Sequence, residues 1–581
     1  MVRSDDWSMT TTHSPAQPTT SPPPVLPPGS AARWPRVAVW LVPAVLVACA
    51  GFERRWMSDD AFIYVRTVRQ VLAGNGPVFN AGERVESSTG TLWQWLLVAA
   101  GAVGVDPASA AVYGGLVLTG AGFALAGLGA LRLHGGRVAV PLGSLLLAGL
   151  PPVWDFATSG LETGLLTCWI AGAWLALATR PRSLATSVLL GLGPLVRPDL
   201  GLVSAVFLGA QWLLVRPSWR GALAGAGAAG ALPAVYEVFR AGYYGHLVPL
   251  PAVTKEASRS LWGRGLEYLG DLVLTYALWV PLVVVVVVVV VVAAVLVRGG
   301  GLRPVAARVP VAALAPVVAG VLCWMYVVKV GGDFMHGRML LPGLLLMLLP
   351  VFVVPVSRAG VCAAVAVGAW AVVSAGWLRV PYEGTIGPAG IADERGVYVR
   401  QNAEPHPVHH TFAGSPYHLR YLREVREAAR SGAPTLLYGG NGPRGTADSP
   451  SVTASYVVLG LNGSVVPLGG AALDPIGLAH PLAAHSERIG GGRVGHDKWL
   501  PAAWLAADRG VPSDPPPGTD PAQVAAARRA LRCGALAELR AATRDPLTPG
   551  RFVRNVAGAW ERTAFRFPND PVAAERKVCG R

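Results

Sequence analysis

The chain has little charge for its length: only 14% of its 581 residues are Asp, Glu, Lys or Arg, whereas 52% are hydrophobic. Together with a mean hydropathy of +0.43, this composition excludes an ordinary soluble domain. Apolar runs at 37–50, 272–297 and 340–356 are long enough, or nearly so, to cross a hydrocarbon core of about 30 Å as helices. The sequence therefore predicts a polytopic α-helical membrane protein.

Three further features are missing from the sequence. It shows no interleaving of basic and aromatic residues, so the net charge of +15 does not indicate a nucleic-acid groove. It shows no convincing internal repeat, which disfavours a transporter or polysaccharide-export component, although that class stays as a minor alternative. The first apolar run begins late and no small-residue cleavage pattern follows it, so we expect no signal peptide.

Composition divides the chain into three parts. Residues 1–33 contain Pro-Pro-Pro and Ser/Thr clusters, which predict a disordered, proline-rich cytoplasmic tail. Residues 34–378 hold the apolar runs and form the predicted transmembrane domain. In residues 379–581 hydropathy falls and Pro, Gly, His and charged residues rise, which predicts one soluble domain of mixed α/β structure.

Basic residues predict the orientation in the membrane. Short loops between the apolar runs carry Arg132, Arg137, Arg180, Arg182, Arg216, Arg220, Arg298, Arg303, Arg308 and Arg358, and the positive-inside rule makes these loops cytoplasmic. The alternation then predicts a cytoplasmic N-terminus and an extracytoplasmic C-terminal domain in the plasma membrane. All clusters of polar residues that are candidates for binding or catalysis then lie on that external side.

The apolar run at 91–104 affects this count, because about 14 residues is short for a span. Counting it as a crossing would invert the topology of every later segment. We therefore expect a re-entrant or interfacial helix there, with a short genuine span as the alternative. The resulting prediction is about 11 transmembrane helices.

Two adjacent acids, Asp59 and Asp60, follow the first apolar run. Ser58 can cap a helix that begins at Asp59, and acids in a first turn suit the helix dipole, so capping alone would explain the pair. Arg66 lies two helical turns after Asp59 on the same face, and Arg69 one turn further. Guanidinium groups suit bidentate phosphate contacts, so the alternative is a general base that faces a lipid-linked phosphate.

The segment 332–338 carries Asp333, His336 and Arg338 between two apolar runs. Charged groups at this depth are costly unless they face a wet cavity or a partner, so they are functional candidates. The alternative is an ordinary polar turn in which Arg338 reaches to the interface.

The six cysteines fall into two groups. Four lie in apolar runs, where a thiol behaves as a small hydrophobic group. Cys533 and Cys579 are the two in the C-terminal domain, and they can form a disulfide if that domain is extracytoplasmic. Two unrelated cysteines are the alternative.

Several motifs carry a resemblance to a known family. They lie at 55–60, 67–80, 82–86, 155–162, 195–199, 242–245, 332–338, 474–478, 481–485 and 495–498. With them the chain resembles the membrane-embedded GT-C glycosyltransferases, in particular the AftB-type terminal β-(1→2)-arabinofuranosyltransferases of actinobacterial cell-wall assembly. The resemblance covers nearly the whole chain after the tail, and Cys533 and Cys579 fall where that family has cysteines.

The resemblance implies transfer of arabinofuranose from decaprenyl-phosphoryl-arabinofuranose to cell-wall arabinan of arabinogalactan or lipoarabinomannan. It maps the family's catalytic acids onto Asp59 and Asp60. A GT-C enzyme that uses another polyprenyl-phosphate sugar, such as mannose, is the alternative. The proline-rich tail, the valine run at 283–292 and the insert at 441–451 depart from the family, and they leave the acceptor glycan open.

The expected mechanism needs a base for the acceptor hydroxyl and cations for the leaving phosphate. We expect Asp59 to be the base, with Asp60 orienting it or binding the acceptor. The candidate donor-phosphate ligands are Arg66, Arg69, Lys255, His336 and Arg338. The candidate sugar or acceptor ligands are Glu162, Arg197, Asp199, Tyr244, Asp333, His485, His496 and Lys498. A divalent cation between Asp59 and a phosphate oxygen is possible in this superfamily, and the sequence does not decide it.

Overall fold

The computed structural model describes residues 33–256, 259–298, 308–408, 415–439, 444–490, 492–493, 495–514 and 516–580. The predicted disordered tail at 1–33 lies outside the described residues except for its last residue. Part of the insert at 441–451 also lies outside them.

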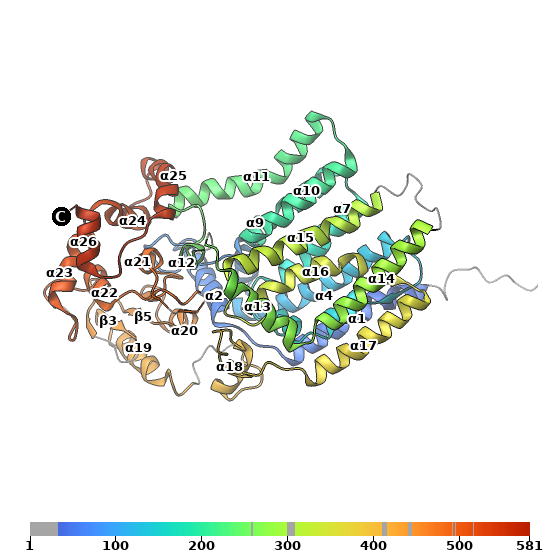
Figure 1. Cartoon of the computed structure of the whole chain (residues 1–581). Helices are drawn as coiled ribbons and strands as arrows, with labels where there is room; N and C mark the ends of the chain where they lie inside the picture. Colours follow the sequence, from blue (N-terminus) through green and yellow to red (C-terminus); the bar gives the residue numbers. More distant parts are fainter. Residues whose placement is uncertain are drawn as a thin grey trace, which may run out of the picture.

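Long helices run side by side as a bundle, and the C-terminal part of the chain packs on one end of it (Figure 1). The helices of the bundle and its connections are α1 (Arg33–Glu53), α2 (Asp59–Leu72), α3 (Thr91–Ala102), α4 (Pro107–Leu133), α5 (Gly143–Ala148), α6 (Pro151–Thr158), α7 (Thr163–Thr179), α8 (Leu184–Gly191), α9 (Gly193–Val196), η1 (Pro198–Leu200), α10 (Gly201–Val215), α11 (Trp219–Tyr243), α12 (Leu250–Thr254), α13 (Trp262–Thr275), α14 (Trp279–Arg298), α15 (Arg308–Val330), η3 (Arg338–Leu340), α16 (Leu341–Leu348), η4 (Leu349–Val351) and α17 (Arg358–Trp377).

Apolar length singles out the helices that can cross a membrane. Among the described residues, five helical segments are long and apolar enough: Pro107–Leu133, Pro198–Val215, Trp219–Tyr243, Pro310–Val330 and Arg358–Trp377. Two bent pairs, α6 with α7 and α13 with α14, raise the number to seven if each pair is one span. The valine run lies within α14. This helical architecture is that of a membrane protein, as its composition predicts.

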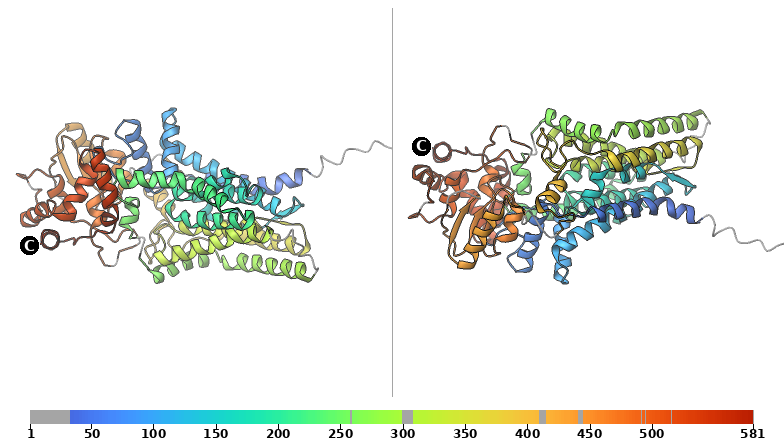
Figure 2. Two further views of the ribbon diagram at one scale, coloured as in Figure 1. Left: turned by 90° about the horizontal axis from the view of Figure 1, so that it is seen from above. Right: turned by 90° about the horizontal axis from the view of Figure 1, so that it is seen from below.

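The first long helices run in opposite directions. In α1 and α4, Trp40 packs against Gly127 and Gly51 against Leu116, so the end of α1 lies beside the start of α4. The chain between them, including α2 and α3, therefore leaves and returns at one end of the bundle. Figure 2 shows α3, in light blue, projecting sideways from the long helices.

A two-stranded antiparallel ribbon links the connection after α4 to the connection before α17. Strand β1 (Ala139–Pro141), which follows α4, pairs antiparallel with β2 (Val353–Pro355), which precedes α17. The connection between α10 and α11 lies at the end of the bundle away from the C-terminal part (Figure 1).

The C-terminal part combines helices with a small sheet. Its strands are β3 (Thr435–Tyr438), β4 (Arg444–Thr446), β5 (Thr453–Ser455) and β6 (Ala471–Leu473), in the order β4-β3-β5-β6 with only β4 antiparallel. Its helices are α18 (Glu394–Asn402), α19 (Leu419–Ser431), α20 (Leu459–Val465), α21 (Pro481–His485), α22 (Ala502–Arg509), α23 (Pro521–Ala530), α24 (Gly534–Arg544), α25 (Pro549–Ala564) and α26 (Pro571–Cys579).

Helix α2 lies between these two parts. Its buried residues Phe62 and Val65 belong to the core of the bundle, whereas Ile63 belongs to the core around the sheet, together with Phe79. Because one short helix serves two hydrophobic cores, its first turn is fixed relative to both.

Candidate active site

The acids of α2 are placed by an N-terminal cap. The side chain of Ser58 accepts a hydrogen bond from the backbone N–H of Ala61 at 3.2 Å, as the sequence predicts for this position. Asp59 and Asp60 then form the first turn, where successive side chains point about 100° apart around the helix axis. The two carboxylates therefore meet different surroundings.

Two cavities meet beside this turn. The first, which we call the bundle cavity, spans about 1120 Å³ of space, part of it open to solvent. It is lined by Asp60, Ile63, Tyr64, Ser87, Thr89, Leu161, Glu162, Arg197, Pro198, Asp199, Pro251, Ala252, Lys255, Tyr326, Val330, Gly332, Asp333, Arg338, Met339 and Leu478.

The second cavity, which we call the domain cavity, spans about 990 Å³ of space, part of it open to solvent. It is lined by Asp59, Asp60, Lys255, Phe334, Ile386, Ala392, Glu394, Val397, Tyr398, Gln401, His418, Val457, Val458, Leu459, Ile476, Leu478, Arg493, Gly495 and His496. Asp60, Lys255 and Leu478 line both cavities. A reactive group beside Asp60 is thus accessible from the bundle on one side and from the C-terminal part on the other.

Cations and acids alternate along the bundle cavity. Arg338 Nη2 lies 2.7 Å from Asp333 Oδ2, and Lys255 Nζ lies 3.8 Å from Asp333 Oδ1. Burial of Asp333 disfavours its charge, but Arg338 and Lys255 outweigh this and lower the pKa of its carboxyl. The cavity therefore has two cationic side chains held next to Asp60 by one ionised carboxylate.

A second ionic group lies deeper in the bundle cavity. Arg197 Nε contacts Asp199 Oδ1 at 2.6 Å, and Arg197 Nη1 lies 3.8 Å from Glu162 Oε1. Tyr64 donates a hydrogen bond to Glu162 at 3.0 Å. The sequence-predicted residues Glu162, Arg197, Asp199, Lys255, Asp333 and Arg338 are thus brought together in one cavity with Asp60.

The two adjacent acids differ in what holds them. The carboxylate of Asp59 accepts hydrogen bonds from the backbone N–H groups of Gly460 and Leu461, each at 2.7 Å, at the start of α20. Burial raises the pKa of Asp59 to about 7, although the hydrogen bond from Gly460 opposes the shift. Asp59 thereby fixes α2 to the C-terminal part.

Asp60 lies at the junction of the cavities. Burial raises the pKa of its carboxyl, and the positive charges of Lys255 and Arg338 work against that rise. A carboxyl that is poised in this way, beside a cavity and two cations, has the character of a general base or acid.

The domain cavity brings in residues that the sequence reasoning missed. Glu394, Tyr398 and Gln401 come from α18, and His418 and Arg493 come from loops. These residues belong to segments without apolar periodicity, so no sequence signal separates them from other surface positions. Glu394 is an acid whose pKa burial raises, with a further contribution from Asp60.

Two cations contact one aromatic ring in the domain cavity. Lys255 Nζ lies 5.8 Å from the centroid of the Phe334 ring, and the guanidinium carbon of Arg493 lies 5.5 Å from it. The predicted residue His496 meets the same ring edge to face at 4.9 Å. Cation–π contacts at these distances hold the two positive groups in place.

Arg66 lies away from both cavities, contrary to its expected role as a phosphate ligand. It is 2% exposed and donates hydrogen bonds to the carbonyl oxygens of Phe79, Gly463, Val466, Pro467 and Gly470. The helical spacing does place it on the face of Asp59, but that face packs against α20. With its donors used in this way, the guanidinium binds the C-terminal part rather than a phosphate.

Three other predicted residues also lie outside the cavities. Arg69 is exposed at the last turn of α2. His336 Nδ1 pairs with Asp271 Oδ2 at 2.5 Å and lines a separate, smaller cavity near Trp56. The buried hydroxyl of Tyr244 donates to the carbonyl of Pro77 at 2.8 Å.

His485 and Lys498 are buried in the C-terminal part. His485 Nε2 lies 3.0 Å from His246 Nε2, and its Nδ1 lies 2.9 Å from the carbonyl of Phe565. Lys498 Nζ donates to the carbonyl of Ala484 at 2.6 Å. Lys498 Nζ also lies 3.4 Å from Glu256 Oε1, so both residues lie between the C-terminal part and the segment at 246–256, not in the two cavities.

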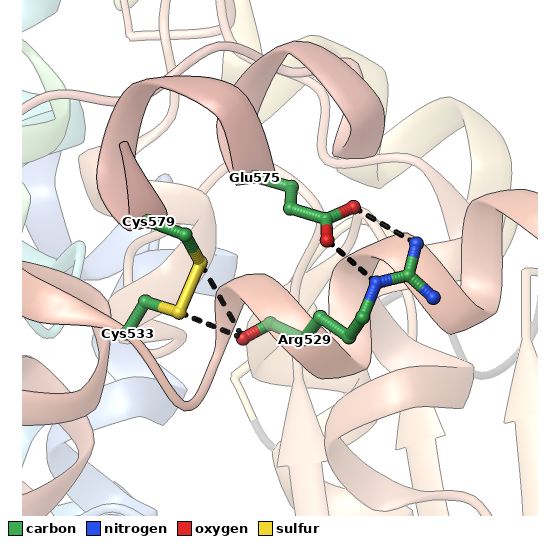
Figure 3. Close-up of a disulfide and its surroundings, with 4 residues drawn as sticks. All are labelled: Arg529, Cys533, Glu575 and Cys579. Atoms are coloured by element: carbon green, nitrogen blue, oxygen red, sulfur yellow. Dashed lines mark hydrogen bonds and ion pairs between the residues drawn. A yellow bond between two sulfur atoms is a disulfide. The ribbon is translucent and has the colours of Figure 1, made fainter. Parts of the chain in front are cut away.

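Cys533 and Cys579 form a disulfide in the structure, with Cα atoms 5.2 Å apart. It ties the start of α24 to the end of α26, next to the ion pair of Arg529 with Glu575 (Figure 3). Within the described ranges, no three His, Cys, Asp or Glu side chains are grouped to hold a metal ion.

Comparison with known proteins identifies the family. Residues 441–575 match the AftB family C-terminal domain. The chain is 35% identical over 616 residues to the terminal beta-(1->2)-arabinofuranosyltransferase of Mycobacterium tuberculosis, which covers 92% of this chain and 96% of that relative. It is 35% identical over 583 residues to the protein of the same name from Corynebacterium glutamicum, covering 89% and 84%. No solved structure matches the chain.

A bundle of membrane-length apolar helices, with a polar two-cavity site at one end and relatives of this kind, is a membrane glycosyltransferase. The chain belongs to the family of the terminal β-(1→2)-arabinofuranosyltransferases, and residues 441–575 are its AftB family C-terminal domain. The resemblance seen in the sequence motifs is confirmed.

Proposed function

We propose that this enzyme transfers arabinofuranose from decaprenyl-phosphoryl-arabinofuranose to the non-reducing ends of cell-wall arabinan, and forms terminal β-(1→2) linkages. The observation that carries the proposal is the meeting of two cavities at Asp60 and Lys255. A transferase must bring a donor and an acceptor to one point from different directions. The names of the relatives supply the sugar and the linkage.

The bundle cavity suits the lipid-linked donor. Its polar end carries Lys255 and Arg338, which can neutralise the charge that grows on the leaving phosphate. Its apolar lining includes Tyr326, Val330 and Met339 from the bundle, where the start of a prenyl chain can lie. The domain cavity then receives the arabinan.

Asp60 is the proposed base, in place of Asp59, the base expected from the sequence, because both oxygens of Asp59 already accept backbone hydrogen bonds. A hydroxyl oxygen of the acceptor forms a bond to the anomeric carbon, and the bond from that carbon to the phosphate oxygen breaks; the sequence does not decide between inversion and retention. The electron pair leaves with decaprenyl phosphate, and the hydroxyl proton passes to Asp60. Asp59, whose two oxygens accept hydrogen bonds from Gly460 and Leu461, positions the helix that carries Asp60.

We propose a topology of eleven crossings with the active site outside. The crossings are α1, α4, the α5–α6 pair, α7, the α8–α9 pair, α10, α11, α14, α15, α16 with its flanking turns, and α17, while α3 stays at the external surface. Residues 34–378 form the membrane domain and 379–581 the extracytoplasmic domain. The antiparallel packing of α1 on α4 and the pairing of β1 with β2 support this path, and a disulfide suits an oxidising compartment.

The test is an assay of purified protein with a synthetic arabinan acceptor and several prenyl-phosphate sugars, followed by linkage analysis. We expect the arabinofuranosyl donor to be used and Asp60→Asn to lower kcat by about 10²- to 10⁴-fold, as loss of general base catalysis does. Donor affinity should change little in this variant. Preference for a mannosyl donor would contradict the sugar assignment, and near-normal turnover of Asp60→Asn would contradict the base.

A further inference from the structure

Helix α18 presents unsatisfied polar groups to the domain cavity. Glu394 and Gln401 both line this cavity. Among the described residues, neither Oε2 of Glu394 nor Oε1 of Gln401 has a hydrogen-bond partner, although both atoms are buried. A buried polar atom without a partner destabilises the fold, and native structures keep such atoms mainly where a ligand or water completes them.

The cavity around these two atoms has the chemistry of a sugar site. Carboxyl and amide oxygens accept hydrogen bonds from hydroxyl groups, and Ile386, Val397 and Val457 give the same cavity an apolar lining for the C–H side of a sugar. Arg493, which also lines the cavity, adds hydrogen-bond donors. An uncharged, polyhydroxylated chain can bind both to hydrogen-bonding groups and to an apolar surface.

The positions of Glu394 and Gln401 along α18 divide the site into two parts. Glu394 is the first residue of the helix, and it interacts electrostatically with Asp60, Asp59 and Arg338, so it lies next to the point where the cavities meet. Gln401 follows seven residues later on the same face, about 10 Å along the helix axis. The two side chains are therefore too far apart to contact the hydroxyls of one furanose ring.

We propose that α18 is the acceptor-recognition helix, with Glu394 binding a hydroxyl of the terminal sugar and Gln401 binding the sugar unit before it. The inference rests on the proposed function and deepens it, because it assigns two successive acceptor subsites. Glu394 is a residue that contacts the acceptor beside the base Asp60. Gln401 makes acceptor affinity depend on acceptor length.

The test compares acceptor KM for a monosaccharide and a trisaccharide arabinofuranosyl glycoside, with the full-length enzyme in detergent. Glu394→Gln should raise KM about tenfold for both acceptors, and Gln401→Ala should raise it about tenfold for the trisaccharide alone, at 1.4 kcal/mol per factor of ten. Donor KM should stay within twofold of wild type. Arg400→Ala, at an exposed position of the same helix, is the matched control and should change neither constant.

The outcomes separate this inference from the proposed function. If the wild-type enzyme transfers no arabinofuranose to either acceptor, the proposed function fails. If wild type is active and Glu394→Gln leaves acceptor KM unchanged, or raises donor KM instead, the acceptor assignment is overturned. A Gln401→Ala effect that is equal for both acceptors overturns the second subsite. Thermal unfolding of each variant, compared with Arg400→Ala, identifies losses that come from misfolding.

Discussion

Asp59 and Asp60 are adjacent in the chain, but their carboxylates serve different partners. Asp59 accepts two backbone hydrogen bonds from α20, whereas Asp60 lies where two cavities meet. The sequence shows that acids follow the first apolar run, but it does not show which acid meets the C-terminal part. The choice between them depends on a contact some 400 positions away along the chain.

The buried state of Asp59 predicts a pH effect on stability. Burial raises its pKa from 3.8 to about 7, so the folded state holds the proton more tightly than the unfolded chain. The resulting stabilisation is fully present below about pH 4 and is lost as the pH rises through about 7. We expect Asp59→Asn to show a smaller drop in unfolding temperature than wild type between about pH 5 and pH 8.

Asp570→Asn is the matched control for this measurement. Asp570 is exposed and also accepts a backbone hydrogen bond, from Ala573 at 2.7 Å. Its variant should keep the wild-type pH slope. An Asp59→Asn slope equal to that of wild type would show that Asp59 is not the titrating group.

At the scale of elements, α2 is held by Arg66. This buried guanidinium donates to five carbonyl oxygens of the 79–80 turn and the 463–470 segment. Arg66→Met would leave several of these carbonyls buried without partners, at about 1–3 kcal/mol each. We expect a loss of about 3–5 kcal/mol in stability, measured as a lower unfolding temperature and faster proteolysis between the bundle and the C-terminal part.

Arg69→Met tests whether the effect belongs to position 66. Arg69 lies in the last turn of the same helix and is exposed, so the same change there should alter stability by less than about 0.5 kcal/mol. Equal unfolding temperatures for the two variants would contradict the structural role of Arg66.

The sequence predicts the elements better than their contacts. The length of the apolar runs predicts a helical membrane protein. The ends of these runs carry Glu162, Asp199 and Asp333, and in the structure all three line the bundle cavity. Helical periodicity places Arg66 on the face of Asp59, but it does not show that α20 covers that face. The polar sequence of α18 carries no periodic signal, so it is the structure that identifies Glu394, which lines the domain cavity and whose buried Oε2 has no partner among the described residues.

At the scale of the whole molecule, the disulfide secures the last helices. It closes a loop with a sequence separation of 46 residues, for which the chain-entropy model gives about 4 kcal/mol. We expect Cys533→Ser with Cys579→Ser to lower the unfolding temperature. Thiol labelling of denatured, non-reduced wild type should leave both cysteines unmodified.

Cys362→Ser is the control, because Cys362 is a free, exposed cysteine of α17. It should remove one labelled thiol without changing the unfolding temperature. Labelling of Cys533 and Cys579 in protein taken directly from membranes would contradict both the disulfide and the external location proposed for their domain.

The position of α2 between two hydrophobic cores has a consequence for the biosynthesis of the enzyme. The bundle is synthesised first. The residues that donate hydrogen bonds to Asp59, most of those that accept them from Arg66, and many that line the domain cavity come from positions after 378. A nascent chain with every membrane helix in place still lacks half of its site. Under the proposed function, the enzyme becomes active only after its C-terminal part has folded onto α2, so incomplete chains in the membrane cannot use the proposed lipid-linked donor.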